Sequence, residues 1–280
     1  MTINVKHIIF AQFALAAMLA PAAHAAQIEA YSGGCVGGPI AKGNCSTPLT
    51  WGIFSSGLLR FGSEVNDGAV YCLSDMGATS PGSPVVLGAC EEPTYWKMAG
   101  NQFIDTNSNL CLEDNAGSLQ ISACGASTTE TWSLNQMAIV NAAGGCLTVP
   151  DNQTNSGTAV QLITCNGGSN TVWQSGAVPG QIQGIGTETA GTRVVTRCLT
   201  ATGSTPGSPV VIQACRKSPD TKQAWSIERS TALGFQANQM FLVDGDGLCL
   251  DATKPRSGTP LVVGTCTDPG AGHEQLWAVQ

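Results

Sequence analysis

The residues that could do chemistry in this sequence are 12 cysteines, one isolated histidine and a few carboxylates. Zinc sites combine closely spaced cysteine and histidine ligands, but no Cys-x-x-Cys pair occurs and only His273 follows residue 25. A second metal candidate, the run from Asp244 to Gly247, lacks the further oxygen ligands of a calcium loop and is typical of a turn. An even number of cysteines in an exported chain favours disulfides. The sequence therefore predicts disulfide bonds, no metal site and no cofactor.

The same inventory argues against catalysis. A Ser-His-Asp triad would depend on His273, and the Gly-x-Ser-x-Gly elbow that carries many serine nucleophiles is absent from the sequence. Paired carboxylates for glycoside hydrolysis need only the right separation in space. However, the repeats described next account for the chain after residue 26 and leave no separate catalytic segment. We expect that the protein is not an enzyme.

The cysteines and the 6 tryptophans occur in one recurring order, Cys…Cys…Trp, with the two cysteines separated by 10 to 19 positions along the chain. Repeats one to six are Cys35, Cys45, Trp51; Cys72, Cys90, Trp96; Cys111, Cys124, Trp132; Cys146, Cys165, Trp173; Cys198, Cys215, Trp225; and Cys249, Cys266, Trp277. In repeats two to six, leucine follows the first cysteine, and an apolar run precedes the second. Such short runs, bounded by Gly, Ser, Pro and Asp, indicate strands and turns. The repeat predicts an all-β fold, with each tryptophan ring buried where the repeats pack together.

The beginning of the chain is typical of a secretory signal peptide, residues 1–25. It has a polar start at Lys6, an apolar run from Ile8 to Leu19, and small residues around His24. The run is too short to span a bilayer, which needs about 20 residues, so we expect a secreted protein without a membrane span. Loss of Lys6 changes the net charge from −7 to −8, which disfavours nucleic acid as a partner.

The order Cys-Leu, apolar strand, Cys and Gln-x-Trp resembles the ricin-B-type lectins, a family of β-trefoils. The full terminal motif stands at Gln223 to Trp225 and at Gln275 to Trp277. Three repeats close one trefoil in that family, which implies two tandem trefoils at 27–135 and 136–280, the first with a degenerate first repeat. An alternative treats repeat one as an appendage and leaves one trefoil incomplete, with exposed strand edges.

We expect each disulfide to lie within one repeat. The predicted pairs are Cys35–Cys45, Cys72–Cys90, Cys111–Cys124, Cys146–Cys165, Cys198–Cys215 and Cys249–Cys266. On the chain-entropy model, one such loop stabilises the fold by about 3 kcal/mol. Asn152 begins a glycosylation sequon, Asn-x-Thr.

The resemblance also implies which residues would bind sugar. In the family an Asp after Cys-Leu accepts hydrogen bonds from hydroxyls, and an aromatic ring two residues before the second cysteine stacks on the sugar. An Asn and a Gln, three and two residues before the tryptophan, support them. Repeat six keeps Asp251 and Gln275, with Glu274 in place of the Asn. No repeat from two to six has a ring at the stacking position, and repeat six has Gly264 there.

A weaker second candidate combines Gln161 and Asn170 of repeat four with Glu113, which replaces the Asp in repeat three. The resulting hypothesis is a secreted lectin that binds glycans or glycoproteins through partly degenerate galactose-type sites, best preserved in repeat six. A structural reading of Asp251 as a strand cap and Gln275 as a brace stays open. The alternative function is a β-trefoil scaffold that binds a protein partner and has lost sugar binding.

Overall fold

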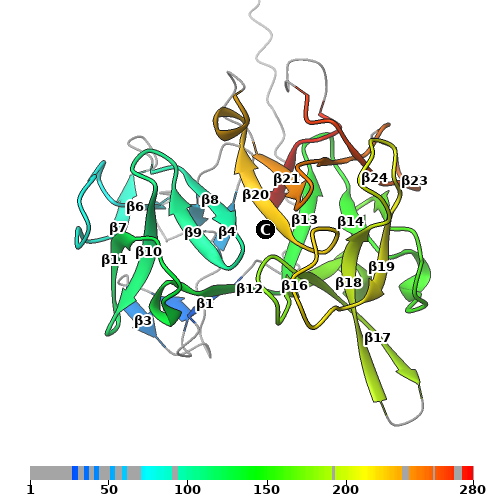
Figure 1. The fold of residues 1–280 in the computed structure, drawn as a ribbon, viewed down its shortest axis with the longest axis horizontal. Coiled ribbons are helices and arrows are strands. Elements are labelled where there is room, and N and C mark those ends of the chain that lie inside the picture. Colours follow the sequence, from blue (N-terminus) through cyan, green and yellow to red (C-terminus); the bar gives the residue numbers. More distant parts are fainter. Residues whose placement is uncertain are drawn as a thin grey trace, which may run out of the picture.

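The computed structural model shows an all-β chain, as the sequence predicts (Figure 1). It describes residues 71–89, 94–190, 193–234, 240–254, 256–267 and 273–279, together with five short strands between residues 27 and 61. The predicted signal peptide lies outside the described residues. Within them, helical structure is limited to short 3₁₀ turns, and no helix is long and apolar enough to cross a membrane.

The strands fall into two successive groups. The first group is β1 (Gln27–Ala30), β2 (Cys35–Gly37), β3 (Ala41–Gly43), β4 (Trp51–Ile53), β5 (Leu59–Phe61), β6 (Tyr71–Ser74), β7 (Val86–Ala89), β8 (Trp96–Ala99), β9 (Gln102–Asp105), β10 (Leu110–Asn115), β11 (Ser118–Ala123) and β12 (Trp132–Asn135). The second group is β13 (Met137–Asn141), β14 (Cys146–Thr148), β15 (Gln161–Ile163), β16 (Val172–Ser175), β17 (Ile182–Ala190), β18 (Arg193–Ala201), β19 (Val210–Ala214), β20 (Trp225–Arg229), β21 (Met240–Asp244), β22 (Cys249–Asp251), β23 (Thr259–Pro260), β24 (Val262–Gly264) and β25 (Trp277–Val279). The 3₁₀ helices are η1 (Thr128–Glu130), η2 (Pro150–Asn152), η3 (Ser169–Thr171) and η4 (Ser230–Leu233).

The recurring tryptophan has the same role in repeats two to six. Its ring is buried, and its indole N–H donates to the carbonyl of the leucine that follows the first cysteine of its own repeat. The five bonds are Trp96 to Leu73, Trp132 to Leu112, Trp173 to Leu147, Trp225 to Leu199 and Trp277 to Leu250, all 2.9–3.0 Å long. A buried indole usually needs such an acceptor. This bond explains why Cys-Leu and Trp recur together. The burial of these five tryptophan rings confirms the prediction for repeats two to six.

Four of the predicted disulfides are confirmed. They join Cys111 to Cys124, Cys146 to Cys165, Cys198 to Cys215 and Cys249 to Cys266. Cys72 is also disulfide-bonded, but its predicted partner Cys90 lies outside the described residues, as does Cys45 of the predicted pair Cys35–Cys45. The bridged cysteines therefore follow the repeat wherever the structure describes both members.

The strands pair into two sheets, and each sheet takes strands from both groups. Strand β1 pairs with β12, and β13 pairs with β25, so the first and last strands of each group are neighbours. Within the second group, Val160, Val210 and Leu261 stand at the same place in repeats four, five and six. Their backbones form a closed ring of hydrogen bonds: Val160 N–H to Val210 O, Val210 N–H to Leu261 O, and Leu261 N–H to Val160 O, at 2.9–3.0 Å. Repeats four to six thus meet around one axis.

The two groups lie side by side in Figure 1, joined near its centre by the β8–β20 and β4–β25 pairings. Arg229, at the end of β20, is buried; its guanidinium lies 3.8 Å from the centre of the Tyr95 ring and donates to the Thr106 hydroxyl at 2.7 Å. Lys97 and Glu228 add an ion pair at 3.7 Å. These contacts join β20 to residues 95–106, although the two segments are distant in the chain.

Candidate functional site

In repeat six, the polar side chains of the candidate site lie on paired strands whose neighbouring residues, Leu250 and Val263, are buried. Strand β22 pairs with β24 so that Leu250 faces Val263 and Asp251 faces Val262. Leu250 is fully buried, its carbonyl accepts the Trp277 indole, and the neighbouring Cys249 is bridged to Cys266. Because successive residues of a strand point to opposite sides, burial of Leu250 turns Asp251 toward the surface. Asp251 is half-buried.

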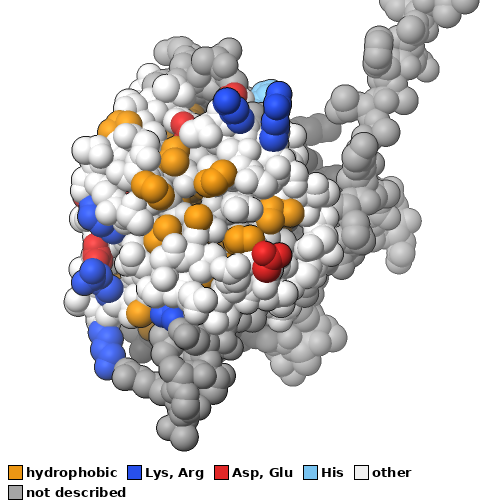
Figure 2. Space-filling model, turned by 90° about the vertical axis from the view of Figure 1, so that its right-hand side faces the viewer, with side chains coloured by type: hydrophobic (Ala, Val, Ile, Leu, Met, Phe, Trp, Pro, Cys, Tyr) orange, Lys and Arg blue, Asp and Glu red, His pale blue; other side chains and the backbone are white. Residues whose placement is uncertain are grey.

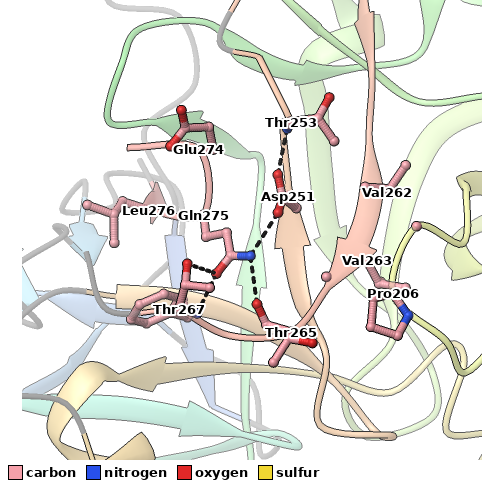
Figure 3. Close-up of a pocket in the computed structure, with 13 residues that line it drawn as sticks. Pro206, Asp251, Thr253, Val262, Val263, Thr265, Thr267, Glu274, Gln275 and Leu276 are labelled. Carbon is pink, nitrogen blue, oxygen red and sulfur yellow. Dashed lines mark hydrogen bonds between the residues drawn. The ribbon is translucent and has the colours of Figure 1, made fainter. Parts of the chain in front are cut away.

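Asp251 and Gln275 are directly hydrogen-bonded, as Figure 3 shows. Gln275 Nε2 donates to Asp251 Oδ2 at 2.8 Å and to the Thr265 carbonyl at 3.0 Å, while its Oε1 accepts from Thr267 N at 3.0 Å. Asp251 Oδ1 accepts from Thr253 N. An ionised carboxylate has about four acceptor positions, and these two bonds leave the others available. The structure therefore brings together two of the residues predicted for the site.

These residues line a cavity of about 530 Å³, within the range of about 300–1,000 Å³ typical of small-ligand sites. Glu274, the third predicted residue, lines the same cavity. Its backbone carbonyl accepts from Ala252 N at 3.0 Å, which fixes the segment that carries it beside β22. In Figure 3, Glu274 lies near the Thr253 end of the cavity, and Thr265 lies near the opposite end. Asp251 and Glu274 therefore both line the cavity, while the hydrogen bond of Gln275 joins it to Asp251.

The stacking position of repeat six cannot hold a larger side chain in this arrangement. A Cβ on Gly264 would lie 2.8 Å from Asp251 Oδ2 and 3.1 Å from Gln275 Nε2. Gly264 thus allows the carboxylate and the amide to lie directly against the backbone of β24. Phe241 also lines the cavity but is fully buried, so its ring is not available for stacking.

Repeat five shows which part of this arrangement is structural. Gln223, the equivalent of Gln275, donates to the Thr200 hydroxyl and to the Ala214 carbonyl, both at 3.0 Å, and accepts from Arg216 N at 2.9 Å. The same brace therefore forms with a threonine in place of the aspartate. It follows that Gln275 has a structural role, because it holds the backbone of Thr265 and Thr267. The distinctive feature of repeat six is the Asp251 carboxylate.

Glu113 belongs to a cluster in repeat three and not to the residues grouped with it from the sequence. Its two oxygens accept from Gln120 Nε2 at 2.7 Å and from the Thr129 hydroxyl at 3.0 Å. Glu130 replaces the terminal glutamine and accepts from Ser122 Oγ at 3.0 Å. Gln120 and Thr129 were not among the residues predicted for a sugar site. The signal was available, because Gln120 precedes its cysteine by four residues, as Gln161 does in repeat four.

Gln161 and Asn170 lie in repeat four without a carboxylate beside them at the Asp position. That position is Thr148, which is buried and donates to the Cys146 carbonyl at 2.8 Å. Asn170 Nδ2 donates to the Val149 carbonyl at 3.2 Å, and Gln161 lies opposite Thr148 on β15. The amide of Asn170 is thus engaged with the backbone.

The run from Asp244 to Gly247 forms the predicted turn. Asp244 Oδ1 accepts from Asp246 N at 3.0 Å and from Leu248 N at 2.9 Å, and Gly247 adopts a positive φ of 81°. Burial raises the pKa of Asp244 above its usual value. Across the part of the chain that the structure describes, no group of three or more His, Cys, Asp or Glu side chains could hold a metal ion.

Comparison with known proteins identifies a family. The model of the ricin-type beta-trefoil lectin domain matches residues 61–173 and 135–240, which includes the cysteines and tryptophans of repeats two to five. The residues of the cavity in repeat six from Phe241 onward lie beyond the matched segments. No curated protein matches the sequence.

Solved structures with similar folds include an agglutinin from Abrus precatorius, which is 18% identical, with 91% of this chain and 95% of that chain covered and a TM-score of 0.38. A non-toxic homologue of type II RIPs from Momordica charantia, solved with α-methyl-D-galactoside, is 20% identical, with 92% and 97% covered and a TM-score of 0.37. A designed three-fold symmetric protein, ThreeFoil, is 18% identical, with 51% and 97% covered and a TM-score of 0.37.

Proposed function

Because the chain belongs to the family of ricin-type β-trefoil lectin domains, we propose that it is a secreted carbohydrate-binding protein whose main site is the cavity of repeat six. The observation that carries this proposal is the Asp251 carboxylate, which faces the cavity with acceptor positions left over after its bonds to Thr253 and Gln275. A carboxylate so placed can accept hydrogen bonds from two adjacent sugar hydroxyls. A galactose-type sugar is the ligand that the family pattern implies for an aspartate at this position.

The strand pairings support two trefoils, at 27–135 and 136–280. The closing pairs β1–β12 and β13–β25 lie at the ends of these two ranges. The ring of Val160, Val210 and Leu261 relates repeats four, five and six as three equivalent units. Repeat one would then complete the first trefoil.

Secretion and a non-enzymatic role complete the proposal. Four bridges among the described cysteines fit an oxidising compartment. The repeat accounts for the described strands, and His273, the histidine of the described residues, is exposed beside the cavity segment. A weaker second sugar site is proposed at Glu113, with Gln120 and Thr129 as its neighbours.

A protein-binding scaffold is the second candidate function. It is favoured by the lack of a stacking ring and by two exposed apolar side chains of repeat two, Met76 at 63% and Val86 at 37%. Met76 lies close to Gly88, which stands at the stacking position of that repeat; its sulfur is 3.6 Å from where a Cβ would be. An apolar surface of this kind suits a protein better than a sugar rich in hydroxyls.

A glycan array with the oxidised, folded protein tests the proposal. We expect selective binding that Asp251→Ala abolishes and that Glu113→Ala, the equivalent change in repeat three, leaves largely in place. Loss with Glu113→Ala alone would move the main site to repeat three. No binding by the folded wild-type protein would reject sugar recognition and leave the protein-binding function as the better account.

A further inference from the structure

The cavity of repeat six has a wall that comes from another repeat. Pro206 and Gly207, in the turn that precedes β19 of repeat five, line it together with Val262. Figure 3 shows Pro206 across β24 from Asp251. The site therefore has a polar side, built around Asp251 and Gln275, and an apolar side to which repeat five contributes.

The wall is held in place by backbone hydrogen bonds. Gly207 N donates to the Val263 carbonyl at 2.8 Å, and Val263 N donates to the Ser208 carbonyl at 2.9 Å. Gly207 adopts a positive φ of 88°, a conformation that glycine reaches without strain, and the pyrrolidine ring of Pro206 fixes the φ of Pro206 itself. Pro206 is thus a rigid surface beside β24, and little conformational entropy would be lost when a ligand packs on it.

The face formed by the second group of strands also carries apolar side chains. Figure 2 shows apolar side chains gathered in the middle of the face formed by the second group of strands, with most charged side chains toward its margins. Pyranose rings carry patches of C–H groups that pack on such surfaces, a role that aromatic rings fill in many sugar sites. Pro206 and Val262 offer C–H surface where Gly264 offers none.

The cavity is larger than one sugar ring requires. Even if each of the roughly 12 heavy atoms of a hexose took the ~30 Å³ of a water molecule in the liquid, one ring would fill at most about 360 Å³. The cavity measures about 530 Å³. The remaining space lies along a surface that has both polar and apolar parts.

We propose that this cavity takes an oligosaccharide of at least two rings, with a terminal ring at Asp251 and the next ring against Pro206 and Val262. This inference rests on the proposed function. It makes Pro206 a specificity-determining residue, which selects extended glycans over single sugars. Repeats four and six have Ser156 and Ser257 at the position of Pro206, so neither offers a proline wall to the repeat beside it.

The chain provides a matched control. Pro81 of repeat two precedes Gly82 as Pro206 precedes Gly207, both glycines have a φ of 88°, and both prolines are exposed. Gly82 N donates to the Ile121 carbonyl of repeat three at 2.7 Å, so Pro81 lies beside repeat three and outside the cavity of repeat six.

The experiment measures the affinities of wild type, Pro206→Ala, Pro81→Ala and Asp251→Asn for galactose, lactose and melibiose by calorimetry. We expect at least one disaccharide to bind wild type more tightly than galactose. Pro206→Ala should weaken that disaccharide by roughly three- to tenfold, the effect of losing up to two partly buried methylene groups, and leave galactose unchanged. Pro81→Ala should match wild type, and Asp251→Asn should weaken all three sugars.

Other results overturn the inference in distinguishable ways. If galactose binds as tightly as both disaccharides, or if Pro206→Ala weakens galactose equally, the second ring does not use Pro206, while the proposed function stands. If Pro81→Ala has the larger effect, the extended site belongs to repeat three. If the folded wild-type protein binds none of the sugars, the proposed function fails and this inference fails with it.

Discussion

Replacing Gly264 with alanine should disrupt the polar side of the cavity, although the change adds only one methyl group. The new Cβ would lie 2.8 Å from Asp251 Oδ2 and 3.1 Å from Gln275 Nε2, the two atoms that form a 2.8 Å hydrogen bond. Contacts this short force one of these side chains to move. A hydrogen bond to a charged group contributes about 1.5–3 kcal/mol, so we expect a comparable loss in the free energy of unfolding.

The same displacement moves the carboxylate away from the sugar hydroxyls. Losing one charge-assisted bond to the ligand lowers affinity by roughly ten- to a hundredfold. Gly88→Ala is the matched control, because it adds a methyl at the equivalent position of repeat two, where the nearest atom is Ser74 Cβ at 3.3 Å. Urea denaturation and calorimetry with lactose measure the two effects. Unchanged stability and affinity in Gly264→Ala would refute the close contact and the role given to Asp251.

Three further predictions test the stability of the fold and the disulfide pairing. Trp132→Phe removes the donor to the buried Leu112 carbonyl, and chemical denaturation should show a loss of about 1–3 kcal/mol; an unchanged midpoint would contradict the role of the indole bond. Burial raises the pKa of Asp244 in the folded state above its usual value near 3.8, so ionisation of this carboxyl group opposes folding. The group does not lower the free energy of unfolding below pH 3.8, and it lowers it fully above the raised pKa. The stability of Asp244→Asn relative to wild type should therefore increase as the pH rises above about 3.8 and level off above the raised pKa, and a difference in thermal unfolding that does not vary with pH would refute this. Mass spectrometry without reduction should find the two remaining bridges, and any dominant pairing between repeats would undo the repeat assignment; the expected pairs are Cys35–Cys45 and Cys72–Cys90.

The fold was predictable because a few residue types with strong preferences recur in one order. Cysteine and tryptophan are sparse, so the 12 cysteines and 6 tryptophans could mark six repeats, the first of them degenerate. The structure supplies the reason for the spacing, since each indole from Trp96 onward bonds to the leucine after the first cysteine. The packing of Arg229 on Tyr95 was not predictable, because it joins strands of different repeats whose proximity depends on the whole fold.

The candidate site was predictable only in part. Asp251 and Gln275 could be found because the family pattern fixes their distance from Cys249 and Trp277 along the chain. Pro206 could not be found in this way, because it reaches the cavity from repeat five through contacts with Val263. Grouping Glu113 with repeat four also lacked a basis in space; its partners lie within its own repeat.

The most direct test of the account is a calorimetric titration of the oxidised, folded protein with lactose, beside Asp251→Asn, which keeps the shape of the side chain and removes its charge. The account predicts saturable binding by wild type and at least a tenfold loss in the variant, the loss of one charge-assisted hydrogen bond. Equal binding by the two proteins would show that the sugar site lies elsewhere. No binding by the folded wild type would contradict sugar recognition itself.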